Sequence, residues 1–239
     1  MTQAQHTILI VGRGKLASEL LDGLHGPGIG EVKRWPPGES SPASPVIVVH
    51  AGSGRELPAV IDYCAHTGSL LLDLSTGDSA LPDTPSFPIV RCPNVNAEML
   101  AFMVMIKQAA TLFRGCAITL TESHQASKTS PPGTALYLAK ALGLDEKAIH
   151  SVRDPAVQAE QLAIPAANLD RHAYHEITIR SPEVEIRLET RVLGKTAYAQ
   201  GLARVIDVVA TMELSPGTYA IVDLVADHAN RPFASDAGR

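Results

Sequence analysis

The chain has 239 residues, of which 45% are hydrophobic and 19% charged, a composition typical of one large globular domain or two small ones. Its formal net charge of −5 argues against a surface for nucleic acid or an anionic membrane. No apolar run reaches the roughly 18 residues of a membrane span, and the N-terminus lacks the residue order of a secretory signal. Three cysteines without zinc-binding spacing indicate reduced, buried thiols, so we expect a cytoplasmic protein.

The first part of the chain alternates strands with helices. Apolar runs predict strands within residues 7–12, 30–35, 46–52, 69–76 and 87–94. Apolar residues at helical spacing predict helices within residues 15–24 and 55–68. This alternation predicts a parallel, doubly wound, Rossmann-like sheet. The link between the second and third strands is short and rich in proline and serine, so we expect that crossover to lack a helix.

The pattern changes near Pro93. Helices are predicted within residues 97–113, 134–142 and 198–212, and strands within residues 116–125, 148–154, 174–180 and 184–193. Charged and apolar residues alternate from Glu185 to Val192, which is typical of antiparallel strands with one wet face. After Gly217 we expect a helix or turn. The predicted fold class is α/β, with a Rossmann-like parallel-sheet domain (1–94 and 200–239) and an α+β domain with a mixed or antiparallel sheet (95–199) for substrate binding and oligomerisation.

A glycine motif, Gly12-x-Gly14-x-x-Ala17, joins the first strand to the first helix. Gly12 would permit a tight turn, Gly14 would let backbone amides approach a pyrophosphate, and Ala17 would let the helix pack closely. The helix N-terminus, where Lys15 and Leu16 lie, adds partial positive charge for the phosphates. The motif predicts a dinucleotide site, and the alternative is a glycine turn that serves packing alone.

The end of the second strand bears on the choice of dinucleotide. A basic residue there favours a ribose 2′-phosphate, and an acidic residue favours the unmodified hydroxyl. Lys33 and Arg34 occupy the strand end, whereas Glu31 lies near its start, so the sequence favours NADPH over NADH. A solvated strand end is the alternative for both cations, and Trp35 either stacks on adenine or packs on the surface.

Loops that follow the later strands face the ligand crevice of an open parallel sheet. We expect the nicotinamide half of the cofactor to contact these loop residues: His50, Ala51, Gly52, Ser75, Thr76, Gly77, Pro93 and Asn94. Asp73 either caps a turn or contacts ligand. Asn94 or Asn96 is expected to cap the long helix that follows, at a junction suited to an interdomain hinge.

A second candidate site lies in the middle of the chain. His124 ends a predicted strand, Lys128 follows in a loop, and a helix opens with Gly133 and Thr134. Helix amides, a hydroxyl and a nearby ammonium form a suitable cradle for a carboxylate, and an imidazole beside them can deliver a proton near neutral pH. The residue types alone leave two interpretations open: a substrate site, or a capped helix with a surface lysine.

The stretch "ESHQASKTSPPGTA" at residues 122–135 resembles the signature of the dihydrodipicolinate reductases, in the form of the plant-type branch. Further similar segments lie at residues 92–103, 151–179 and 184–209. The resemblance implies that His124 donates a proton and that Lys128 binds the substrate and assists protonation. It also implies that Gly133 and Thr134 hold a substrate carboxylate, and that Gln125, where many members have a second His, contacts the other carboxylate.

The resemblance implies an activity as well. Hydride from NADPH or NADH would be delivered to a dihydrodipicolinate-type ring C=C conjugated with an imine, giving tetrahydrodipicolinate on the diaminopimelate route to lysine. Hydride addition builds negative charge, which cationic neighbours stabilise and an acid quenches. The implied partner is a small dicarboxylate substrate, and the implied assembly is a homotetramer formed through the antiparallel sheet.

The sequence departs from the family's pattern in several places. Thr129 and Ser130 stand where the family has an Asp after the Lys, and "HAGSG" and "DLSTG" replace its loops after the third and fourth strands. These differences leave open a reductase of another cyclic imine or keto acid, and a non-catalytic dinucleotide-binding protein. His172 and His175 are expected on different faces of a strand, either as structural residues or at the rear of the substrate pocket, and we expect no metal site.

Overall fold

The computed structural model of the protein describes residues 5–36, 45–75, 80–129, 132–194 and 197–230. Contacts divide the chain into two compact units, Met1–Val104 with Tyr198–Arg239, and Met105–Ala197. The predicted domains divide at 94/95 and 199/200, whereas these units divide at 104/105 and 197/198. One continuous helix, α3 (Ala97–Ala109), begins in one unit and ends in the other. No helix within the described ranges is long and apolar enough to cross a membrane.

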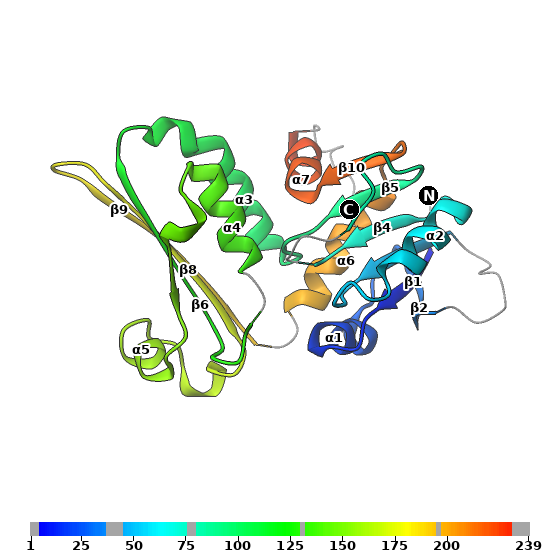
Figure 1. The fold of residues 1–239 in the computed structure, drawn as a ribbon, viewed down its shortest axis with the longest axis horizontal. Coiled ribbons are helices and arrows are strands. Elements are labelled where there is room, and N and C mark those ends of the chain that lie inside the picture. The colour runs from blue at the N-terminus through cyan, green and yellow to red at the C-terminus, as the bar shows by residue number, and fades with distance from the viewer. Residues whose placement is uncertain (1–4, 37–44, 76–79, 130–131, 195–196, 231–239) are drawn as a thin grey trace, which may run out of the picture. The chain divides into compact units, whose positions relative to one another are not determined.

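The first unit is built on a six-stranded parallel sheet in the order β10-β5-β4-β3-β1-β2 (Figure 1). Each pair of neighbouring strands in this sheet is parallel. The strands are β1 (His6–Val11), β2 (Ile29–Arg34), β3 (Val46–His50), β4 (Leu70–Asp73), β5 (Pro88–Arg91) and β10 (Gly217–Ala220). The strand order reverses direction at β1, as in a doubly wound sheet, so the predicted Rossmann-like class is confirmed.

Besides the start of α3, four helices among the described residues accompany the sheet of the first unit. They are α1 (Lys15–Gly23), α2 (Leu57–Thr67), α6 (Ala197–Ala210) and α7 (Ile221–Asn230). Leu57, Val60 and Cys64 of α2 form one core cluster with Leu9 and Val11 of β1. Because side chains alternate along a strand, the intervening residues of β1 are left for the opposite face of the sheet.

The sixth strand, β10, was not predicted. The sequence favoured a helix or turn after Gly217, but Gly217–Ala220 pairs in parallel with Pro88–Arg91 at the edge of the sheet before α7 begins. Four residues carry too little periodicity to distinguish a strand from a turn, and the backbone of β5 supplies the missing partner. The C-terminal segment therefore completes the first sheet.

The second unit carries a mixed four-stranded sheet in the order β7-β6-β8-β9 (Figure 1). Its strands are β6 (Ala117–His124), β7 (Ile149–Val152), β8 (His172–Arg180) and β9 (Glu185–Leu193). β6 pairs in parallel with β7 and antiparallel with β8, which pairs antiparallel with β9. The helices are α4 (Gly133–Leu142), which packs against β6 and β7, and the short α5 (Pro155–Glu160), which the sequence did not reveal.

Helix α6 approaches the backbone that precedes α3 very closely. A methyl group at Gly201 would overlap the carbonyl oxygen of Val95 and would lie 2.8 Å from the Cα of Asn96. Two backbones meet here without an intervening side chain, so neither side can yield by a change of rotamer.

We therefore expect Gly201→Ala to lower the free energy of unfolding by about 2–3 kcal/mol, because overpacking outweighs the gain in helix propensity. Denaturant unfolding followed by circular dichroism measures the change. Gln200→Ala, at an exposed position of the same helix, is the matched control and should change stability by less than about 0.5 kcal/mol. A Gly201→Ala protein as stable as the parent would contradict the close packing.

Candidate functional site

The glycine turn lies between β1 and α1, as predicted. Gly12 has a φ of +121°, and a Cβ there would lie 2.6 Å from the carbonyl oxygen of Ala51, so this position requires glycine. Gly14 is the N-cap of α1, is exposed, and has no atom within 4 Å of an added Cβ. Because Gly14 has no side chain, the backbone amides of the first helical turn, at Lys15 and Leu16, are not obstructed there. This arrangement would let a phosphate approach the helix N-terminus.

Arg34 ties the end of β2 to this turn. Its Nη1 donates a hydrogen bond of 2.9 Å to the carbonyl oxygen of Gly12, and a guanidinium carries five N–H donors in all. Lys33 instead forms an exposed ion pair of 2.8 Å with Glu31 of the same strand. Trp35 packs edge-to-face on Tyr63, with ring centroids 5.2 Å apart, so the structure supports its packing role. The two predicted cations therefore differ, and Arg34 is the one held at the glycine turn.

A buried pair links the ends of β3 and β4. His50 and Asp73 are almost fully buried, and His50 Nδ1 lies 2.8 Å from Asp73 Oδ1. Asp73 also accepts hydrogen bonds from the backbone N and the Oγ of Ser75, so the predicted turn cap is present. His50 Nε2 has no hydrogen-bond partner among the described residues. Two further predicted contacts, Thr76 and Gly77, lie outside the described residues.

Two asparagine side chains accept hydrogen bonds from backbone amides at the junction between β5 and α3. Asn96 Oδ1 accepts a hydrogen bond of 2.9 Å from the backbone N of Met99, so Asn96 caps α3. Asn94 Oδ1 accepts one of 2.8 Å from the backbone N of Asn96. Pro93 stands between these residues and β5. The sequence left the choice of cap open, and the structure assigns the cap to Asn96 and the preceding turn to Asn94.

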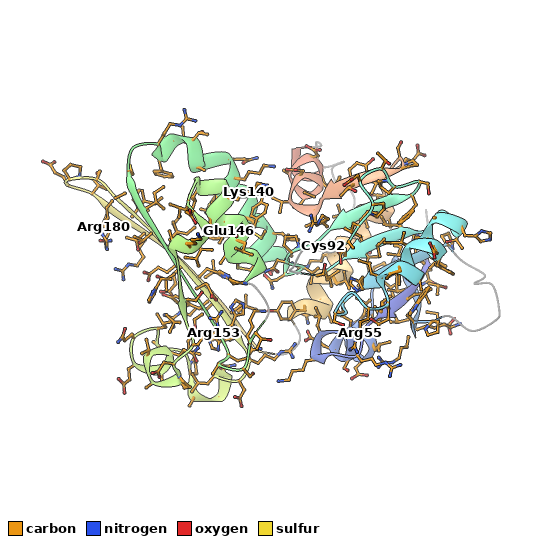
Figure 2. All side chains as sticks on the ribbon, in the orientation of Figure 1. Arg55, Cys92, Lys140, Glu146, Arg153 and Arg180 are labelled. Atoms are coloured by element: carbon orange, nitrogen blue, oxygen red, sulfur yellow. The ribbon has the colours of Figure 1, made fainter. Side chains whose placement is uncertain are left out.

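The second unit gathers three charged or titratable side chains at one end of its sheet. Glu122 and His124 are two residues apart on β6, so their side chains lie on one face. His124 Nδ1 lies 2.7 Å from Glu122 Oε2, within hydrogen-bond distance. Arg153, which follows β7 (Figure 2), donates from Nη2 to Glu122 Oε1 at 2.6 Å and from Nη1 to Oε2 at 3.2 Å. The exposed fraction of the side chain is 0% for Glu122, 15% for His124 and 27% for Arg153.

The charges of these groups are set by their neighbours. Burial raises the pKa of the Glu122 carboxyl, but the hydrogen bonds that it accepts outweigh this and lower that pKa to about 2. Burial lowers the pKa of His124; the Glu122 carboxylate opposes this lowering, whereas the nearby ammonium and guanidinium groups add to it. Burial and Arg153 likewise lower the pKa of Lys128. At neutral pH the Glu122 carboxylate is therefore ionised, and the charge of the His124 imidazole depends on the balance between burial, this carboxylate and the neighbouring cations.

A second histidine, on strand β8, packs against the ring of His124. His175 is directly opposite Glu122 in the β6–β8 register, is 1% exposed, and meets the His124 ring edge-to-face with centroids 5.9 Å apart. Burial lowers its pKa to about 3, so His175 is neutral at pH 7. His172, three residues earlier, faces the other side of the sheet and lies 2.9 Å from the hydroxyl of Ser123. The predicted separation of the two histidines is confirmed.

The remaining predicted residues lie close by along the chain. Gln125 and Lys128 form a turn in which the backbone N of Lys128 donates to the carbonyl oxygen of Gln125 at 2.9 Å. Helix α4 begins at Gly133, and Thr134 in its first turn is 7% exposed. The second unit thus holds all five predicted catalytic and substrate residues, whereas the predicted cofactor residues belong to the first unit.

Sequence reasoning missed Glu122 and Arg153 as parts of the cluster, and it left open whether His175 is structural or lies at the rear of the substrate pocket. Glu122 had a usable signal, because a residue two positions before His124 on a strand must share its face. The partners from other strands had none, since they depend on the pairing register of the sheet. Among the described residues, no group of three histidine, cysteine or acidic side chains could hold a metal ion.

Comparison with known proteins bears on the second unit above all. Residues 99–225, just over half of the chain, match the family model described as Dihydrodipicolinate reductase, C-terminus. The protein named 4-hydroxy-tetrahydrodipicolinate reductase 1, chloroplastic, of Arabidopsis thaliana is 32% identical over 120 residues, which cover 46% of this chain and 35% of that protein. A 4-hydroxy-tetrahydrodipicolinate reductase of Caldanaerobacter subterraneus subsp. tengcongensis is 25% identical over 200 residues, covering 74% and 71%. The match thus spans about a third of the Arabidopsis protein's length.

Solved structures show the same fold. A dipicolinate-bound dihydrodipicolinate reductase from Paenisporosarcina sp. TG-14 aligns with a TM-score of 0.64 over 92% of this chain and 99% of that chain, at 16% identity. A probable dehydrogenase from Thermotoga maritima aligns with a TM-score of 0.52 over 91% and 92%, at 10% identity. At such identities the likeness concerns the fold alone. Together with the family match over residues 99–225, it leads to one conclusion: the chain belongs to the dihydrodipicolinate reductase family.

Proposed function

We propose that this protein is a reductase that uses NADPH or NADH to convert a dihydrodipicolinate-type ring to tetrahydrodipicolinate, on the diaminopimelate route to lysine. The observation that carries the proposal is the close pairing of His124 with the buried Glu122, with Lys128 four residues further on, inside the segment that matches the family model. The relatives that share this segment are named for that reaction.

The first unit fits a dinucleotide. Gly12 and Ala51 pack too closely for any side chain, Gly14 leaves the start of α1 open, and the buried His50 Nε2 lacks a partner among the described residues. These features are what a pyrophosphate and a nicotinamide half need: amide donors, close backbone approach and an unsatisfied polar group. When bound, the cofactor would supply a hydride to the substrate ring.

The second unit supplies the proton. His124, as imidazolium, would donate from Nε2 to the ring carbon that becomes saturated, while Nδ1–H stays bonded to Glu122. Lys128 would hold negative charge as it develops on the ring. Both groups lie within the matched segment, four residues apart in the chain, which supports their joint role.

The same unit would bind the two carboxylates of the substrate. The first-turn amides of α4, with Gly133 and Thr134, form a helix N-terminus that favours an anion. Gln125 would contact the second carboxylate from the turn that precedes Lys128. Dipicolinate, which the Paenisporosarcina reductase binds, is a ring with two such carboxylates and is the natural probe.

Among the two cofactors we propose that NADPH is preferred. Arg34 is held against the carbonyl of Gly12 at the end of β2, where a 2′-phosphate would meet it. Its planar guanidinium can bind the carbonyl and a phosphate at once. Lys33, paired with Glu31, contributes less.

We also propose that the protein assembles into a tetramer through the wet face of the second sheet. That face carries alternating opposite charges, with exposed ion pairs from Glu185 to Arg180 and from Glu189 to Arg191. Such an arrangement can pair with its own copy across a two-fold axis and close a dimer, and a second two-fold contact between dimers would complete the tetramer. Light scattering of the purified protein should give about four times the chain mass at micromolar concentration; a monomer would contradict this.

The activity is tested with dihydrodipicolinate made in situ from pyruvate and aspartate semialdehyde, while NADPH oxidation is followed by absorbance. Lys128→Ala should cost about 2–4 kcal/mol of transition-state stabilisation, because one positioned charge is lost. Lys140→Ala, which removes an exposed ammonium from α4 (Figure 2), is the matched control and should retain parental rates. No turnover by the parent protein, or a loss below about tenfold for Lys128→Ala, would reject the proposal.

Cofactor preference has a separate test. Arg34→Ala should weaken NADPH binding about tenfold or more and leave NADH binding almost unchanged, since only NADPH carries the 2′-phosphate. Fluorescence titration of the reduced cofactors gives both dissociation constants without turnover. Lys33→Ala is the comparison and should have the smaller effect; equal losses for both cofactors in Arg34→Ala would show that Arg34 only stabilises the turn.

A further inference from the structure

Glu122 is a charged side chain with no exposed surface, and an isolated carboxylate in that position would be strongly disfavoured. It persists because each oxygen is occupied. Oε1 accepts from Arg153 Nη2, and Oε2 accepts from both Arg153 Nη1 and His124 Nδ1. The carboxylate is therefore fixed in one orientation before any ligand arrives.

We propose that Glu122, clamped by Arg153, is a positioning residue for the candidate acid His124: it fixes the imidazole with Nδ1 toward the sheet and so directs Nε2 away from it. This inference rests on the proposed function for its kinetic consequences only. An ionised carboxylate accepts and cannot donate, so the ring nitrogen facing it must carry a proton. The other nitrogen, Nε2, is then the atom at which the transferable proton is held.

The remaining neighbours keep the ring in this orientation. The ring of His175 lies edge-to-face against His124, and it is itself fixed by burial and by Thr190 of β9, whose Oγ1 is 3.3 Å from its Nδ1. Gln158 of α5 donates to the backbone carbonyl of His124 at 2.7 Å. A rotated ring would have to give up the bond to Glu122.

The charges around His124 act in opposite directions. The Glu122 carboxylate favours the imidazolium, while Arg153 and Lys128 disfavour it and His175, being neutral, has little effect. Arg153 therefore has two roles: it keeps Glu122 ionised, and it limits how strongly that carboxylate holds the proton on His124. A proton donor must be able to release its proton, so a partly neutralised carboxylate suits the task better than a bare one.

The step balances as follows. A bound reduced cofactor would supply a hydride to one carbon of the C=C bond and would itself be oxidised, and the electron pair of that bond would take the proton from Nε2 of the imidazolium at the other carbon. One Nε2–H bond breaks, one C–H bond forms, and a neutral imidazole remains, with Nδ1–H still donating to Glu122. Solvent then returns the proton to Nε2.

The decisive measurement is made on the protein without cofactor or substrate. Nitrogen-15 NMR of the histidine rings, with His124 assigned through His124→Gln, should show neutral His124 as the Nδ1–H form in the parent. Titration should then give shifts of opposite sign in two variants. Glu122→Gln should lower the pKa of His124 by about one unit or more, and Arg153→Gln should raise it. If Glu122 and Arg153 served stability alone, the pKa of His124 would not shift in opposite directions in the two variants.

Kinetics supply the second arm. Glu122→Gln should lower kcat about 100-fold with little change in KM, because the carboxylate acts through His124 and does not touch the substrate. The basic limb of its pH profile should move to lower pH, and Glu122→Asp should recover part of the rate by restoring the charge. Glu146→Gln, which removes an exposed carboxylate from the segment after α4 (Figure 2), is the matched control and should behave as the parent.

The outcomes separate the two proposals. An inactive parent would overturn the proposed function, while the NMR titration would still decide the role of Glu122. An Nε2–H ring in the parent, or pKa shifts of the same sign in Glu122→Gln and Arg153→Gln, would overturn the positioning role. If Glu122→Gln does not fold, Arg153→Gln alone still tests it, because a fall in the pKa of His124 in that variant contradicts the proposal.

Discussion

The second unit is organised around a carboxylate that water does not reach. Glu122 must be satisfied by protein groups on every side, because an unpaired buried charge costs several kcal/mol. Arg153, after the end of β7, and the ring of His124 on β6 meet this requirement through their hydrogen bonds with the carboxylate. The parallel pairing of β6 with β7 and the antiparallel pairing with β8 are therefore part of the candidate site, since each adds one neighbour to the cluster.

The first unit is organised by close contact between backbones. Gly12 meets Ala51 at the carboxyl ends of β1 and β3, and Gly201 of α6 meets Val95 before α3. In both places the glycine lacks the Cβ that other residues carry, so the backbone of a segment distant in sequence can approach it closely. The His50–Asp73 pair adds a buried polar link between the neighbouring strands β3 and β4. Rigid backbone, rather than long side chains, shapes the candidate cofactor site.

The sequence was sufficient for features that depend on local pattern. Apolar runs and helical spacing predicted the doubly wound sheet, the glycine turn at Gly12 and the strand that ends at His124. It was insufficient where a partner comes from a distant segment. The short strand β10 exists because β5 offers an unpaired edge, and the contact of His175 with His124 follows from the β6–β8 register, which no single-strand pattern encodes. Arg153 resembled any other loop cation until its distance to Glu122 was known.

The contact between Gly12 and Ala51 has a bearing on protein engineering. The backbones of these two loops are in close contact, so a loop after β1 taken from a relative would contact a segment after β3 to which it is not matched. Both segments should therefore be exchanged together. The segment after β3 follows His50, whose pairing with Asp73 extends the same dependence to the end of β4. Chimaeras that exchange all three strand ends as one block should thus fold where single-loop swaps fail.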